Sequence, residues 1–213
     1  MTKEDVLTRI RSTGVVAVVR AETGDEAARI ADACLAGGLQ AIEITFTVQG
    51  ALNVLRDLRR RYRDDEILLG AGTVLDPETA RAALLEGANY IVAPSLNLET
   101  VRLCHRYRVA CMPGAMTVRE VVDVMESGAD VVKVFPGESL GPTFIRAVRG
   151  PLPQACLMPT GGVSLDNAAD WIRAGAIAVG VGGQLTAPAK TGNFEAVTRD
   201  AQRFIEAVRE ARK

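Results

Sequence analysis

The sequence predicts an α/β protein with the (β/α)8 fold of a TIM barrel and one extra helix at the N-terminus. Eight short apolar runs alternate with longer segments of helical period along the 213 residues, a pattern typical of parallel strands joined by helices. A repeat of roughly 25 residues suits a barrel. An open doubly wound sheet is disfavoured, because the first predicted strand runs into RAETGDEA and not into the GxGxxG turn of that fold.

The elements are expected in strict alternation, and a first helix over 3–12 would cover the floor of the barrel. The predicted strands are 15–20, 41–46, 68–74, 90–94, 110–115, 131–136, 157–162 and 176–182. The predicted helices are 24–36, 50–63, 77–87, 97–107, 117–127, 142–149, 165–174 and 193–211.

Several helix boundaries have recognisable signals. Asp76 precedes Pro77, as a capping residue before a first-turn proline, and Asp166 or Ser164 is expected to cap the helix over 165–174. The helices that end in glycine stop at Gly37, Gly87, Gly128 and Gly175. Because barrel enzymes carry their active sites at the carboxyl ends of the strands, we expect the functional residues at the end of each apolar run.

The composition predicts one domain over 1–213 with a large core. Hydrophobic residues make up 48% and charged residues 24% of the chain, as in ordinary globular proteins. No apolar run reaches the roughly 18 residues of a membrane span, and the first residues lack the apolar core of a signal peptide. We therefore expect a cytoplasmic protein without a membrane partner, and the net charge of −1 predicts no nucleic-acid partner.

Two sets of residues are interpreted as structural. A basic run is expected to be a solvated helix face and consists of Arg56, Arg59, Arg60, Arg61 and Arg63. The cysteines lack any CxxC spacing and are expected to be small apolar residues of a reduced protein: Cys34, Cys104, Cys111 and Cys156.

Lys133 is the residue that least suits a core. It stands among valines in DVVKVFP, and the two-residue period of a strand places it on the same face as Val131 and Phe135. Burial can lower the pKa of a lysine by as much as about 3–5 units, which leaves a neutral amine able to attack a carbonyl. We predict a catalytic lysine. The alternative is a structural lysine that neutralises a carboxylate or reaches the rim.

Glu43 is the carboxylate that we predict to act together with Lys133. In AIEITF, Ile42 and Ile44 form one face of the strand, and Glu43 and Thr45 form the other. If the apolar face packs on helices, Glu43 lies inside the barrel opposite Lys133, where it could move protons during imine chemistry. A simple buried ion pair between the two is the equal alternative.

Four more residues stand near strand ends, where a substrate would bind. Thr73 could hold a carboxylate or, equally, cap the following helix. Arg20 could grip a carboxylate or phosphate with two hydrogen bonds. Pro94 and Phe135 could form apolar walls of the site or serve only in packing.

Two glycine-rich turns follow the last two predicted strands, Thr160-Gly161-Gly162 and Gly182-Gly183. Backbone N–H groups in such turns, in front of helix starts, can bind an anion, and barrels often hold phosphate at the loops after these two strands. The alternative is that the glycines only permit tight turns.

These residues, taken in order, resemble the class I KDPG (2-dehydro-3-deoxy-phosphogluconate) aldolases and their 4-hydroxy-2-oxoglutarate and 6-phosphogalactonate relatives. The similarity extends from Val15 to Thr186 and includes IEITFT at 42–47, GAGTV at 70–74, PGAMT at 113–117, KVFPGE at 133–138 and PTGGV at 159–163.

The resemblance implies a role for each matching residue. Lys133 would form the Schiff base, Glu43 would be the general acid/base, and Thr73 would contact the pyruvyl carboxylate. Gly161 and Gly162 would help to hold the phosphate. The resemblance also implies a homotrimer that uses no metal and no other cofactor.

The sequence departs from this family at two positions. Many members have an arginine where this chain has Thr47, so that anion contact is missing, and Arg20 from the neighbouring strand could supply the guanidinium. Thr47 itself is kept among the candidate substrate-binding residues. Members that bind phosphate tend to have serine where this chain has Gly183.

The reaction that the resemblance implies is the reversible cleavage of KDPG to pyruvate and glyceraldehyde 3-phosphate through a Schiff base. The partner would thus be a small, phosphorylated 2-oxo acid. Within the family, 2-dehydro-3-deoxy-6-phosphogalactonate and unphosphorylated 4-hydroxy-2-oxoglutarate are alternative substrates. A sugar-phosphate epimerase is a disfavoured alternative. Such enzymes generally use a pair of acidic residues or a metal, and the only candidates in this sequence are Glu43 and His105. A non-catalytic barrel that binds sugar acids is the third alternative.

Overall fold

The computed structural model describes residues 1–213 and has a mixed α/β fold with a curled parallel sheet at its centre. Six strands pair in the order β5-β4-β3-β2-β1-β9, and three more pair in the order β6-β7-β8. The strands are β1 (Val15–Val19), β2 (Ala41–Thr45), β3 (Leu68–Gly72), β4 (Tyr90–Val92), β5 (Ala110–Met112), β6 (Gly114–Ala115), β7 (Val132–Val134), β8 (Leu157–Pro159) and β9 (Val179–Val181).

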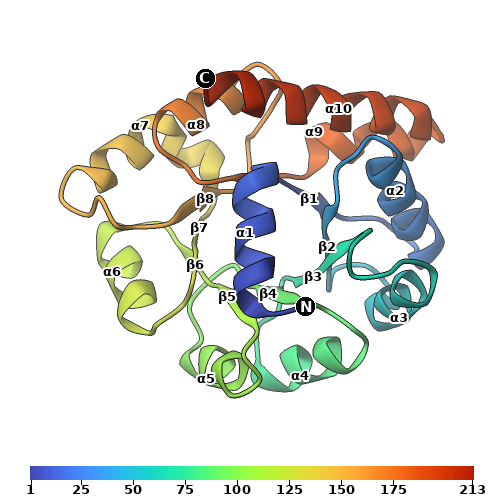
Figure 1. Ribbon diagram of the computed structural model, residues 1–213, viewed down its shortest axis with the longest axis horizontal. Helices are drawn as coiled ribbons and strands as arrows, with labels where there is room; N and C mark the ends of the chain where they lie inside the picture. The colour runs from blue at the N-terminus through green and yellow to red at the C-terminus, as the bar shows by residue number, and fades with distance from the viewer.

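The helices surround these strands on the outside, as Figure 1 shows, except for the first helix. They are α1 (Lys3–Thr13), α2 (Gly24–Ala36), α3 (Ala51–Arg61), α4 (Pro77–Leu85), α5 (Leu98–Arg106), α6 (Val118–Glu126), α7 (Gly137–Arg149), α8 (Ala168–Arg173), α9 (Gly183–Thr186) and α10 (Phe194–Ala211), with a short 3-10 helix, η1 (Ala187–Thr191). None of these helices has the length and apolar character needed to cross a membrane.

Alternate residues of each strand face opposite ways, because successive side chains of a strand point to opposite sides. In β2, Ile42 and Ile44 belong to the large apolar cluster shared with the helices. Ala41 belongs to a second, smaller cluster that fills the space enclosed by the strands. Glu43 has the same parity as Ala41 and therefore also faces this enclosed space.

Helix α1 closes one end of that space. Its Val6 and Ile10 are buried in the inner cluster together with Tyr90 and Met158 from the strands. The helix begins with a capping box at Thr2, and Figure 1 shows it lying across the centre of the ring of strands. Apolar packing therefore closes one end of the curled sheet. The opposite end, where the carboxyl ends of the strands lie, is the end at which an active site is expected.

The structure corrects several predicted boundaries. The predicted strand 110–115 is interrupted at Pro113, which has no N–H to donate to a ladder. The first strand ends at Val19, before Arg20. The helix predicted over 142–149 is confirmed as the second part of α7; a further helical stretch that was not predicted precedes it from Gly137, and the two are separated by the non-helical Gly141, where φ is 71°. Neither Asp166 nor Ser164 caps the next helix, whose N-cap is Asn167.

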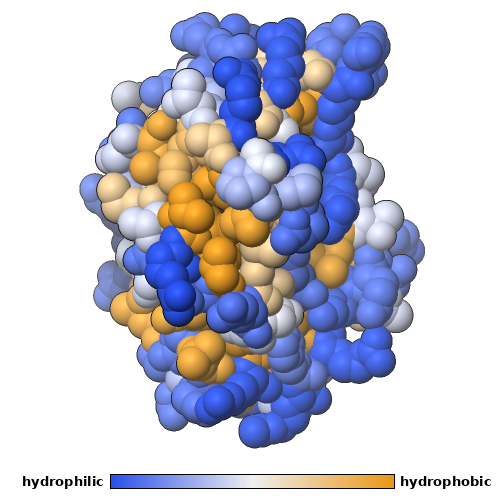
Figure 2. Space-filling view, turned by 90° about the vertical axis from the view of Figure 1, so that its left-hand side faces the viewer, coloured by the Kyte–Doolittle hydropathy of each residue, from blue (hydrophilic) through white to orange (hydrophobic).

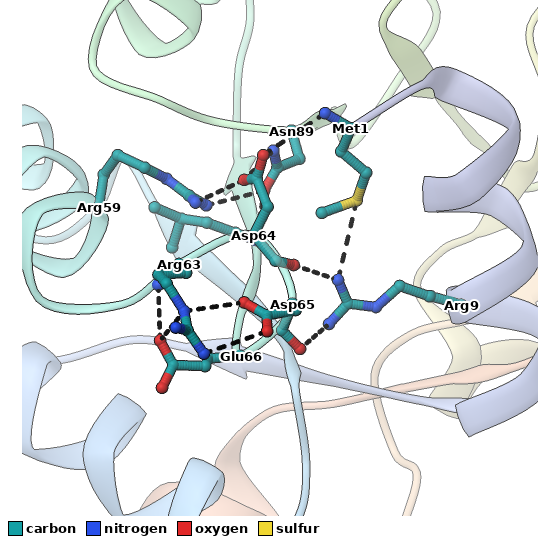
Figure 3. A network of polar contacts seen from close by, with 9 residues as sticks. Met1, Arg9, Arg59, Arg63, Asp64, Asp65, Glu66 and Asn89 are labelled. Atoms are coloured by element: carbon teal, nitrogen blue, oxygen red, sulfur yellow. Dashed lines mark hydrogen bonds and ion pairs between the residues drawn. The ribbon is translucent and has the colours of Figure 1, made fainter.

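The arginine run is not simply a solvated helix face. Arg59 pairs with Asp64 at 2.5 Å and also donates to Asn89, and Asp64 receives the N-terminal amine of Met1 as well. Arg9 of α1 donates to the backbone carbonyl of Asp64 in the same network, which Figure 3 shows from close by. These contacts fasten α3 and the start of α1 to the loop that precedes β3.

Candidate active site

Glu43 and Lys133 are the two charged residues that the fold encloses. Glu43 is 0% exposed on β2, and Lys133 is 2% exposed on β7. The neighbours of Lys133 in register are Gly114 and Met158. Both side chains face the space inside the curled sheet, one layer above the apolar cluster that α1 closes.

The two groups are not locked in an ion pair. Both carboxylate oxygens of Glu43 are buried without a hydrogen-bond partner. Lys133 forms no salt bridge, and its Nζ lies 5.0 Å from the centroid of the Phe135 ring. The closed pair that was the structural alternative is therefore absent, and the amine is left available for another partner.

Burial shifts the pKa values of Glu43 and Lys133 in opposite directions. Burial raises the pKa of Glu43, and the positive charges of Lys133 and Arg20 oppose this shift only in part. Burial lowers the pKa of Lys133; Glu43 opposes this shift, and Arg20 adds to it. Both shifts favour a protonated Glu43 beside a neutral Lys133, which is the state that a nucleophilic amine requires.

Strand β3 supplies empty space next to Glu43. A Cβ built on Gly72 would lie 1.9 Å from Oε1 of Glu43, so the carboxylate occupies the place of the missing side chain. Gly70 gives room in the same way to Tyr90, whose Cζ would lie 2.1 Å from a Cβ there. Tyr90 was missed in the sequence, although the period of 90–94 places it on the inner face with Pro94.

Thr160 lies on the same inner face beyond the end of β8. It is 3% exposed, and its hydroxyl has no hydrogen-bond partner. Its Oγ1 would lie 2.3 Å from a Cβ on Gly180, so the hydroxyl too fills the place of an absent side chain. Thr160 thus joins Glu43 and Lys133 in a layer of unpartnered polar groups.

Thr73 and Thr47 lie at the rim. Thr73 follows β3 with φ at 58°, an unfavourable conformation for a β-branched residue. It does not cap α4, because Asp76 accepts the capping hydrogen bond from Thr79. Thr47 is exposed, and its Oγ1 is 2.7 Å from that of Thr45. Strain at a strand end is typical of functional positions, which favours Thr73 as a contact.

Arg20 is exposed just after β1 and lines a cavity of about 460 Å³. Lys190 and Arg29 line the same cavity, together with Glu22 and Glu26. Arg20 and Lys190 form no salt bridge, and the guanidinium of Arg29 stacks on Phe194 at 3.9 Å. The cavity therefore offers two cations without a salt bridge, and Arg20 lies close enough to Glu43 and Lys133 to affect the pKa of each.

Pro94 and Phe135 line a second cavity, of about 210 Å³, with Gly114 and Met116. Phe135 thus has one face towards Lys133 and borders a hollow that reaches the surface. This placement agrees with an apolar wall beside the amine.

The two glycine turns differ. Gly161 and Gly162 have φ values of 93° and 68°, and a Cβ on Gly161 would lie 2.1 Å from Oε2 of Glu138. A carboxylate therefore stands against the turn that was expected to bind phosphate. Gly182 is half-buried, and Gly183 is exposed at the start of α9, where a Cβ would have no atom within 4 Å.

The fold and the enclosed pair define an α/β enzyme with an amine and a carboxyl poised for proton and carbonyl chemistry. A family model for KDPG and KHG aldolase matches residues 6–200. The chain therefore belongs to the KDPG and KHG aldolase family.

Individual relatives agree with this assignment. The chain is 34% identical to a 2-dehydro-3-deoxy-phosphogluconate aldolase of Treponema pallidum (strain Nichols), covering 96% of each chain. It is 33% identical to a 2-dehydro-3-deoxy-6-phosphogalactonate aldolase of Escherichia coli (strain K12), covering 92% of this chain and 95% of the relative. A solved protein cage, designed by fusing symmetric oligomeric domains, matches with a TM-score of 0.86 at 32% identity, covering 93% of this chain and 73% of the cage chain.

Proposed function

We propose that this protein is a class I aldolase that reversibly cleaves 2-dehydro-3-deoxy-6-phosphogluconate to pyruvate and glyceraldehyde 3-phosphate. The observation that carries the proposal is the buried amine of Lys133, which forms no salt bridge and lies close enough to the unpartnered carboxyl of Glu43 for each to shift the pKa of the other. Membership of the aldolase family supports the same reaction. His105, the other residue considered for an epimerase, bonds to the carbonyl of Gly128 at 3.0 Å on an exposed surface, away from Lys133.

The first half of the reaction builds an iminium ion. Neutral Lys133 attacks the C2 carbonyl of the 2-oxo acid, and protonated Glu43 gives its proton to the developing oxygen. Loss of water from the carbinolamine leaves a positively charged C=N bond. Glu43, now a carboxylate in a site of low polarity, stabilises this charge.

The second half breaks the carbon chain. Glu43 accepts the proton of the C4 hydroxyl while the electrons of the C3–C4 bond move towards the iminium nitrogen. The aldehyde leaves, and an enamine of pyruvate remains on Lys133. Protonation of this enamine and hydrolysis of the imine release pyruvate and return the amine.

Two regions are suited to the anionic ends of the substrate. We assign the pyruvyl carboxylate to the strand ends near Thr73, Thr47 and Thr160, against the apolar wall of Pro94 and Phe135. For the phosphate we assign the mouth between Arg20 and the turns at 161–162 and 182–183. The free cations of Arg20 and Lys190 support this side of the mouth, because Glu138 opposes an anion at Gly161.

The larger organisation is also part of the proposal. We infer one domain over 1–213 whose strands close into a full (β/α)8 barrel plugged by α1. Support comes from the parallel bridge between Thr160 and Gly180, which links β8 to β9, and from the bond of 2.9 Å between the Lys133 N–H and the Pro113 carbonyl. Four unpaired cysteines fit a reducing, cytoplasmic location.

We further propose a homotrimer. Figure 2 shows an apolar patch on the side of the molecule where α6 and α7 lie. Met116 and Val118, at the start of α6, are 44% and 48% exposed. A contiguous apolar patch of this kind is typical of a protein interface, and the relative that was built into a cage came from symmetric oligomeric domains.

Chemical trapping tests the central claim. Pyruvate and borohydride are added to the protein, and the reduced adduct is mapped by mass spectrometry of peptides. We expect one pyruvyl group per chain, on Lys133, with Lys3, Lys190 and Lys213 unmodified as internal controls. An adduct spread over the exposed lysines, or none at all, would contradict the proposal. Rates with KDPG, its galactonate epimer and 4-hydroxy-2-oxoglutarate then rank the substrates.

A further inference from the structure

Three neighbouring strands bring Glu43 and Tyr90 to the same level of the inner face. Glu43 on β2 is paired in register with Gly70 on β3, and Gly70 is paired with Tyr90 on β4. Gly70 has no side chain, so nothing stands between the residue on β2 and the residue on β4.

The two side chains lean across β3 towards each other. The atoms nearest to a Cβ on Gly70 are Cζ, Cε2 and Cε1 of Tyr90, at 2.1, 2.3 and 2.7 Å, so the far end of the ring lies over this glycine. The carboxylate of Glu43 lies over Gly72, two residues further along the same strand. The hydroxyl on Cζ therefore lies below the carboxylate, on the side that faces the apolar layer.

The hydroxyl of Tyr90 lies in apolar surroundings and has no hydrogen-bond partner. The ring belongs to the inner apolar cluster with Leu68, Val92 and Met158. The hydroxyl is buried without a partner, and so are both oxygens of Glu43. An unsatisfied buried polar group destabilises the fold, and a hydrogen bond between the hydroxyl and the carboxyl would satisfy both side chains at once.

We propose that Tyr90 is a positioning residue for Glu43: its hydroxyl donates a hydrogen bond to the carboxyl and holds it over Gly72, aimed at the Lys133 amine. The consequence for turnover rests on the proposed aldolase function, but the hydrogen bond itself does not. Burial and the neighbouring Glu43 raise the pKa of Tyr90 well above its usual value, so the phenol stays protonated and can donate to the carboxylate form of Glu43.

The groups around Glu43 determine whether the hydrogen bond from Tyr90 raises or lowers the pKa of Glu43. The charged and titratable groups that face Glu43 are Lys133 from β7, Arg20 from the end of β1, and Tyr90 from β4. A donated hydrogen bond stabilises the carboxylate form and so lowers the pKa of Glu43 relative to a site without it. Loss of the hydroxyl must therefore raise that pKa.

The test is Tyr90→Phe, which removes the hydroxyl and keeps the ring over Gly70. The protonated carboxyl of Glu43 is followed by infrared difference spectroscopy against pH and is identified by its loss in Glu43→Gln. We expect its apparent pKa to rise by about one unit in Tyr90→Phe, a tenfold change in the ionisation constant. In Tyr62→Phe, which removes a hydroxyl bonded to Asp32 at 2.9 Å on the surface, it should not move.

Kinetics give the second readout. We expect kcat of Tyr90→Phe to fall by about tenfold with KM nearly unchanged, and the limb of the pH profile that disappears in Glu43→Gln to move to higher pH. An unchanged carboxyl pKa in a folded Tyr90→Phe protein would refute the hydrogen bond. The infrared titration needs no substrate, so a failure of the aldolase proposal would show separately, as the absence of a pyruvyl adduct on Lys133.

Discussion

The inner face of the curled sheet has two layers of opposite character. The lower layer is wholly apolar apart from the Tyr90 hydroxyl, is closed by Val6 and Ile10 of α1, and satisfies the ordinary demands of a core. The layer above contains Glu43, Lys133 and Thr160, all nearly inaccessible, and none of their side chains has an ion-pair or hydrogen-bond partner. The apolar layer thus stabilises the fold. The polar layer is unfavourable for stability, and its buried groups are available for catalysis.

Lys133→Met is the change that breaks the upper layer most completely. It should abolish the pyruvyl adduct and lower kcat/KM by roughly 10⁴-fold or more, because the nucleophile is gone. The melting temperature should rise, since an apolar chain of similar size replaces a buried amine without a partner. Calorimetry and a steady-state assay measure both. Lys213→Met, at an exposed position outside the proposed site, is the control that should change neither by much. A folded Lys133→Met protein that keeps its activity would refute the catalytic role.

Glu43→Gln separates imine formation from proton transfer. Turnover should fall by about 10²–10⁴-fold, the usual contribution of a placed proton donor. Trapping by borohydride should still label Lys133, because the amine remains and the amide is nearly the same size as the carboxyl. Measurement of kcat and of adduct yield on the same protein shows whether Glu43 is needed for proton transfer, for imine formation or for both. A rate equal to that of the unchanged protein would remove Glu43 from the mechanism.

Gly72→Ala tests the space that β3 leaves for the carboxylate. The added Cβ would lie 1.9 Å from Oε1, so Glu43 must take another rotamer and lose its aim at Lys133. We expect kcat to fall by roughly 10–100-fold, within the range caused by small misplacements of a catalytic group. Gly150→Ala, at the exposed end of α7 with φ at −56°, is the matched control, because a Cβ there would meet its nearest atom only at 3.4 Å. Equal rates in the two variants would show that the position of the carboxylate is not critical.

Ile10→Ala addresses the lower layer alone. Loss of a fully buried side chain from the plug should cost about 2–5 kcal/mol of the free energy of unfolding. The rate per folded molecule should stay nearly constant, because Ile10 touches the apolar layer and not the polar one. Denaturant titration and activity at a low temperature provide the two values. A large loss of kcat with little loss of stability would erase the distinction between the layers.

Much of this arrangement could be predicted from the sequence. The alternation of apolar runs indicated the order of strands and helices, and the parity of β2 correctly placed Glu43 opposite its apolar face. The break at Pro113, the helical stretch that precedes Gly141 in α7 and the pairing of Arg59 with Asp64 were not predicted. Tyr90 escaped notice because a tyrosine in a strand is ordinary, and its orphaned hydroxyl exists only in three dimensions. The carboxylate of Glu138 beside Gly161 is likewise a tertiary contact.

The glycines of β3 have a consequence for how this family can vary. Residue 70 can gain a side chain only if residue 90 gives up its ring, because both would claim the same volume. In the same way, residue 72 can gain a side chain only if residue 43 no longer carries a carboxylate in that place. In an alignment of many family members we therefore expect these two pairs to change together, so that evolution records the shape of the site at positions that carry no functional group.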